Sequence, residues 1–127
     1  MVCLDMNGTL CYRCDDPLEG AREDLFIRHR YYYARPGIRD FVRRLVSSRF
    51  FSVYVYTSMM AHNAEAGLNA ILPSYKTQLA GVLDRDMTMP DPGSANDWDT
   101  VRDMEKARLP CPRAPPSPAC CCFPAAH

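Results

Sequence analysis

The sequence has no long hydrophobic run, no excess of one charge and no basic segment ahead of an apolar stretch at its start. The longest apolar stretch, residues 50–56, is far shorter than the roughly 18 residues that a membrane-spanning helix needs. We therefore expect no secretory signal and no membrane partner. Fifteen Lys and Arg balance fifteen Asp and Glu, for a net charge of zero, which argues against direct binding to nucleic acid.

Cysteine and proline are abundant but unevenly placed. The seven Cys are odd in number and are not spaced as a disulfide framework, so we expect a reducing compartment, the nucleus or cytoplasm. Residues 110–127 contain four of these Cys and six of the eleven Pro, with no acidic residue. Such composition is typical of a disordered tail. We expect the folded domain to occupy residues 1–109 and a Pro/Cys-rich tail to occupy 110–127.

Hydrophobic patterning predicts an α/β fold. Apolar runs with strand character end at Asp5, Thr57 and Leu83, and two stretches of helical periodicity separate them. This alternation is typical of a parallel sheet flanked by helices. In detail, the pattern predicts a loop at 15–17 within the mixed and charged stretch 11–28, strand character at 31–33, helices over 38–45 and 61–72 (the second capped by Ser58), a loop over 88–96 and a short helix over 99–108.

Polar residues follow each of the three predicted strands. Asp5 follows the first, Thr57 and Ser58 follow the second, and residues 84–86 follow the third. Ligands of a parallel sheet bind beyond the carboxyl ends of its strands. A carboxylate there can attack phosphorus and form an acyl-phosphate, while hydroxyl groups and the backbone of the glycine-containing turn 7–9 can hold phosphate oxygens.

Four segments in this order resemble one family. Residues 2–10 are similar to the first motif, Asp-x-Asp-x-Thr, of phosphatases in the haloacid-dehalogenase superfamily. Residues 35–41, 53–58 and 83–86 resemble motifs of one branch, the RNA polymerase II C-terminal-domain phosphatases and related NLI-interacting-factor-like proteins. The resemblance covers about residues 1–106 and implies the Rossmann-like parallel sheet of that superfamily.

The resemblance implies a role for individual residues. Asp5 would be the nucleophile and, together with position 7, would hold Mg²⁺, while Thr57 would bind the phosphoryl group. Arg102 stands where the family has the lysine of a Val-Lys-Asp-Leu motif, and Lys106 is the second candidate for this charge. The implied phosphate-binding set is Gly8, Thr9, Thr57, Ser58, Arg102 and Lys106.

Two departures from the family pattern bear on activity. Asn7 replaces the second aspartate of the first motif, the general acid/base, and an amide cannot supply the proton transfer worth about 10²–10⁴-fold in rate. The fourth motif, an acidic pair after another apolar strand, is missing after Lys106. We therefore expect weak Mg²⁺ binding and a partial domain, incomplete at its C-terminal end, whose first strand lies at an exposed edge.

Two hypotheses of function follow. The first is a phosphatase of reduced activity that removes phosphate from Ser or Thr of a phosphorylated protein or peptide. The second is a non-catalytic protein-binding module on the same fold, similar to mitochondrial import-receptor subunits, which would place the chain in mitochondria. Asn7 and the missing fourth motif favour the second hypothesis, whereas Asp5, Gly8 and Thr57 favour the first.

Overall fold

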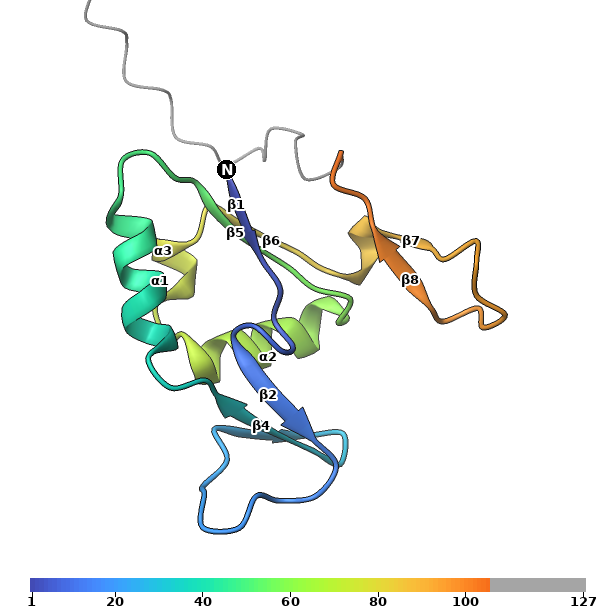
Figure 1. The fold of residues 1–127 in the computed structure, drawn as a ribbon, viewed down its shortest axis with the longest axis horizontal. Coiled ribbons are helices and arrows are strands. Elements are labelled where there is room, and N and C mark those ends of the chain that lie inside the picture. The colour runs from blue at the N-terminus through green and yellow to red at the C-terminus, as the bar shows by residue number, and fades with distance from the viewer. Residues whose placement is uncertain (106–127) are drawn as a thin grey trace, which may run out of the picture.

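The computed structural model describes residues 1–105, which form a parallel sheet, an antiparallel sheet and a β-hairpin with helices between them (Figure 1). The elements in chain order are β1 (Val2–Leu4), β2 (Cys11–Cys14), β3 (Leu25–Ile27), β4 (Arg30–Ala34), α1 (Ile38–Ser47), β5 (Val53–Tyr56), α2 (Ala61–Ile71), α3 (Tyr75–Gln78), β6 (Gly81–Leu83), the 3-10 helix η1 (Arg85–Met87), β7 (Thr88–Pro90) and β8 (Thr100–Arg102).

The main sheet has the strand order β1-β5-β6 and is parallel throughout. Leu4 pairs with Val55, and Val55 pairs in turn with Val82, so the three predicted strands end at the same edge. The expected parallel α/β architecture is confirmed. Within residues 1–105, β1 pairs with no strand other than β5, and it lies at the edge of the sheet as expected.

β5 is the central strand because its sequence suits burial. Val53 and Val55 are β-branched and buried, and the ring of Tyr56 is buried as well. Val53 and Val55 join one hydrophobic core with Leu4 of β1 and Leu68 of α2. The predicted strand is longer than the observed one, since Phe50 precedes β5 and is 89% exposed.

A small antiparallel sheet, of strand order β2-β4-β3, is inserted between β1 and α1. The loop predicted at 15–17 lies in the connection between β2 and β3, but the patterning of 11–28 gave no sign of these two strands. β2 and β3 are three or four residues long, and each becomes a strand by pairing with β4, whose three consecutive tyrosines suit a sheet. Such pairing is a tertiary effect that local patterning does not contain.

The β7–β8 hairpin corrects the two predictions made for the segment after β6. Residues 88–96 begin as a strand, and Thr100–Arg102 is a strand where a helix was expected over 99–108. β-branched Thr100 and Val101 favour extended backbone, and their antiparallel pairing with β7 fixes it. Figure 1 shows this hairpin projecting away from the helices. Residues 106–108 and the predicted tail lie outside the described residues.

The start of α2 also differs from the prediction. Its N-cap is Met60, without a side-chain hydrogen bond, instead of Ser58. Thr57 Oγ1 accepts a hydrogen bond from the backbone N–H of Met59 at 3.2 Å, and this local turn carries the chain from β5 into the helix two residues later. No helix in the described part of the chain is long and apolar enough to cross a membrane.

Close packing joins the loop after β1 to α2. Met6 is completely buried, and a Cβ atom added to Gly67 of α2 would overlap its terminal methyl group. Because Met6 directly follows Asp5, this contact fixes the end of β1 against the helix.

We predict that Gly67→Ala lowers the free energy of unfolding by about 1–2 kcal/mol, because the terminal methyl group of the completely buried Met6 must shift away from the new Cβ atom. Denaturant unfolding would measure the effect. Asn69→Ala, at an exposed position of the same helix, is the control. It should lower the free energy of unfolding by less than about 0.5 kcal/mol. Gly67→Ala combined with Met6→Ala should lose less than the sum of the single changes, and an additive result would contradict the clash.

Candidate active site

Asp5 lies directly after β1, at the carboxyl edge of the parallel sheet. Its Oδ1 accepts a hydrogen bond from the backbone N–H of Met6 at 2.7 Å. The side chain is 30% exposed, so the carboxylate is held in one orientation yet is open to solvent. It is therefore placed as a nucleophile needs to be.

Arg102 reaches Asp5 from the other end of the described chain. Its Nη2 donates to Asp5 Oδ1 at 2.6 Å, although the two residues are 97 positions apart. Charge-assisted hydrogen bonds of this length are stronger than those between neutral groups. Asp5 Oδ2 accepts no hydrogen bond from residues 1–105, which leaves this oxygen available for reaction.

The turn after Asp5 is closed by its own backbone. Leu10 and Cys11 both donate their N–H groups to the carbonyl of Met6, and the N–H of Gly8 donates to the carbonyl of Cys11 at 2.7 Å. Gly8 has a φ of 86°, which glycine adopts without strain. Its N–H is thus used within the turn, whereas Thr9 is exposed beside it.

The side chain of Cys11 contacts the same turn. Its buried Sγ donates to the carbonyl of Met6 at 3.5 Å and contacts Asn7 Oδ1 at 3.8 Å. Burial is the main reason why the pKa of the Cys11 thiol is raised from 9.0 to about 11, and the negative charges of Asp5 and Asp24 add to this rise while nearby arginines oppose it. The thiol is therefore neutral and structural near pH 7.

Thr57 follows β5 at the same edge of the sheet. It is fully buried, and its N–H donates to the carbonyl of Leu83 at 2.8 Å. Its Oγ1 accepts from Met59, and its hydroxyl hydrogen has no acceptor in the part of the chain that the structure describes. The hydroxyl therefore lies buried at the sheet edge with one hydrogen-bonding partner among the described residues. Ser58 is half-buried beside it.

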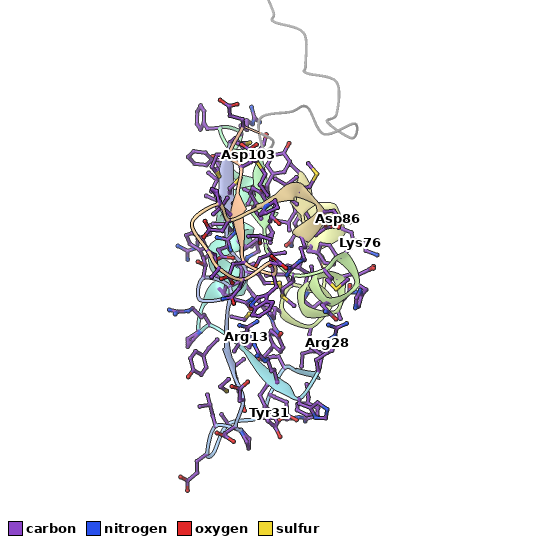
Figure 2. All side chains as sticks on the ribbon, turned by 90° about the vertical axis from the view of Figure 1, so that its right-hand side faces the viewer. Arg13, Arg28, Tyr31, Lys76, Asp86 and Asp103 are labelled. Atoms are coloured by element: carbon purple, nitrogen blue, oxygen red, sulfur yellow. The ribbon has the colours of Figure 1, made fainter. Side chains whose placement is uncertain are left out.

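The acidic residues after β6 have a structural role. Asp84 Oδ1 caps η1 by accepting from the N–H of Asp86 at 2.9 Å. Arg85 donates its Nη2 to the carbonyl of Trp98 at 2.7 Å, inside the connection between β7 and β8. Figure 2, which faces the hairpin side of the molecule, shows Asp103 at the upper end and Asp86 below it.

The donors for a magnesium ion are few. Residues 1–105 contain no group of three or more His, Cys, Asp or Glu that could hold a metal. Asp5 contributes one carboxylate, and one of its oxygens is paired with the positive charge of Arg102. Mg²⁺ prefers oxygen ligands in near-octahedral geometry, and Asp5 with Asn7 falls short of such a set. The described residues therefore do not fit a resident Mg²⁺.

The structure brings Asp5, Arg102 and the turn 6–9 together, with Thr57 at the same sheet edge, and Lys106 lies outside the described residues. The residue that the sequence patterns missed is Tyr56. Its hydroxyl bonds to the backbone of Met87, just before β7, and of Asp103, just after β8. A tyrosine at the end of a buried strand is indistinguishable in sequence from any other core aromatic residue. Only the fold reveals these partners.

A parallel α/β sheet with a carboxylate after its first strand, a hydroxyl after its second and a cation paired with the carboxylate defines a class of protein. It is a Rossmann-like α/β protein with a cluster of polar residues at the carboxyl ends of its parallel strands. In agreement, a family model described as NLI interacting factor-like phosphatase matches residues 1–110, and the chain belongs to this family. A search of the curated proteins found no match.

The raised pKa of Cys11 predicts a pH dependence of stability. The thiol ionises near pH 9.0 when unfolded and near pH 11 when folded, so its contribution is complete below about pH 9 and is lost as the pH rises toward about 11. Denaturant unfolding across this interval should show a shallower loss of stability for Cys11→Ala than for the wild type. Equal slopes for Cys11→Ala and the wild type would contradict the assignment.

Proposed function

We propose that the chain is a slow phosphoprotein phosphatase that removes phosphate from Ser or Thr of a protein or peptide, with Asp5 as nucleophile. The observation that carries this proposal is the Asp5–Arg102 pair, 2.6 Å between Arg102 Nη2 and Asp5 Oδ1. The pair places a positive charge beside the carboxylate, where the phosphoryl oxygens of a bound ester would lie. Membership of a phosphatase family supports the same proposal.

The proposed reaction has two steps. In the first, Asp5 Oδ2 attacks phosphorus, the bond from phosphorus to the Ser or Thr oxygen breaks, and the released alkoxide takes a proton from water. In the second, water attacks the aspartyl-phosphate, inorganic phosphate leaves and the carboxylate is restored. Arg102 and the free hydroxyl hydrogen of Thr57 bind phosphoryl oxygens in both steps.

Asn7 explains why turnover is slow. Its amide neither donates a proton to the leaving oxygen nor takes one from the attacking water, and both steps lose general acid–base help. Its Oδ1 is turned toward Cys11 Sγ, at 3.8 Å. An ester with a good leaving group needs no acid in the first step. The second step still needs a base, so the phosphorylated form should accumulate.

A second candidate function is a non-catalytic module that binds a polypeptide. Two observations favour it. Asn7 stands in the place of the acid/base, and Asp5 belongs to no cluster of metal-binding side chains among the described residues. Under this proposal the Asp5–Arg102 pair is a structural remnant of the family site. The nuclear or cytoplasmic location would then give way to a mitochondrial one.

The family resemblance implies that Asp5 and Asn7 hold Mg²⁺, which would neutralise phosphoryl charge, but the described residues do not complete such a site. The sequence of steps above does not depend on it. Assays with and without Mg²⁺ would test the family expectation directly.

We predict that an aryl phosphate gives a burst of aryl alcohol close to one equivalent per chain, followed by slow turnover. The first step proceeds because the leaving group is good, whereas the second lacks its base. Stopped-flow absorbance would measure both phases. Asp5→Asn should abolish the burst, and equal rates for Asp5→Asn and the wild type would overturn the enzyme proposal.

Restoring the acid/base separates the two candidate functions. Asn7→Asp should raise steady-state turnover by about 10²–10⁴-fold, with a larger gain for an alkyl phosphate such as a phosphoserine peptide than for the aryl ester. No gain with either substrate, together with no burst from the wild type, would favour the binding module.

A further inference from the structure

We propose that Tyr56 is a positioning residue whose hydroxyl holds the β7–β8 hairpin so that Arg102 faces Asp5. The inference concerns the site of the proposed phosphatase and rests on that proposal for its catalytic consequence. Its geometry stands on hydrogen bonds of the described residues alone.

The Tyr56 hydroxyl bonds to both strands of the hairpin at its open end. It donates to the carbonyl of Met87 at 2.6 Å, and it accepts from the N–H of Asp103 at 3.1 Å. Met87 directly precedes β7 and Asp103 directly follows β8. One hydroxyl thus closes the hairpin at the end where its two strands leave the body of the molecule.

Arg102 lies beside this closure. It is the last residue of β8 and pairs with Thr88, the first residue of β7. The hydroxyl of Tyr56 therefore holds Asp103, the neighbour of Arg102, and Met87, the neighbour of Thr88. The direction in which the Arg102 side chain leaves β8, and so its 2.6 Å contact with Asp5, depends on this fixed backbone.

The hairpin has little else to hold it. Each strand is three residues long, and an isolated two-stranded hairpin is marginal in water. Met89 and Val101, which pair across the strands, are both more than 40% exposed. Within residues 1–105, the other bonds that hold it are the Asp5–Arg102 pair, the exposed hydrogen bond from Arg85 to the carbonyl of Trp98, and the one from Thr88 Oγ1 to the carbonyl of Arg85.

Tyr56 is suited to this task because its two ends differ. The ring is 2% exposed and packs in the core at the end of β5, while the hydroxyl emerges where the hairpin begins. Buried tyrosine hydroxyls need a partner, and here the partners are the hairpin's own backbone. The next residue is Thr57, which is proposed to bind phosphate. The end of β5 therefore holds both this residue and the tyrosine that positions Arg102.

The test compares Tyr56→Phe with Tyr54→Phe in the full chain. Tyr56→Phe keeps the buried ring and removes the hydroxyl, whereas Tyr54 lies on the same strand, half-buried, with no hydrogen bond from its hydroxyl in the described part of the chain. Hydrogen exchange of the amides of 88–90 and 100–103 should become at least about tenfold faster in Tyr56→Phe. Exchange in β1 and β5 should be unchanged, which shows that the fold is intact.

Two further measurements separate positioning from general support. The NMR signals of the Arg102 guanidinium should move to those of a free arginine in Tyr56→Phe and in Asp5→Asn, but not in Tyr54→Phe. The burst rate with an aryl phosphate should fall about tenfold in Tyr56→Phe, and Tyr56→Phe should add no further loss to Arg102→Ala, because it acts through that residue.

The outcomes are distinct. Unchanged hairpin exchange or an unchanged Arg102 signal in Tyr56→Phe would overturn the inference. So would a loss of burst rate that adds fully to that of Arg102→Ala. A wild-type chain without any burst would overturn the phosphatase proposal, and the exchange and NMR measurements would then still decide the role of Tyr56.

Discussion

The candidate site depends on one ion pair, between the Asp5 carboxylate after the first strand and the Arg102 guanidinium at the end of the last one. A partly exposed pair contributes little to stability by itself. Its importance is geometric, because it brings together residues 97 positions apart. Packing of Met6 against Gly67 fixes one partner, and the hydrogen bonds of Tyr56 fix the backbone beside the other.

Sequence patterns predict the main sheet well because it is built from local signals. Apolar runs such as 53–56 become strands, and the polar residues Asp5 and Thr57 follow from where these runs end. The segments 11–14 and 100–102 fail because their strands form by pairing with distant partners. Such short segments carry too little periodicity to overrule a loop or helix prediction.

The prediction of the site follows the same division. The place of Arg102 in a motif predicts that it supplies a counter-charge, and this stays a prediction. The structure puts its guanidinium against Asp5, although the expected helix is a strand. The backbone of turn 7–9 is expected to hold phosphate oxygens, but within that turn the N–H of Gly8 bonds to the carbonyl of Cys11. Tyr56 was not recognised at all, because its hydrogen bonds join backbone groups that only the folded hairpin brings near it.

We propose Asp5 as the nucleophile that takes up the phosphoryl group. Locating a covalent phosphoryl group on the chain tests this most directly. The full chain would be incubated with an aryl phosphate, quenched in acid, digested and analysed by mass spectrometry. The account predicts one phosphoryl group, on Asp5, which Asn7 leaves long-lived. No phosphoryl group on Asp5, or the same labelling in Asp5→Asn, would contradict it.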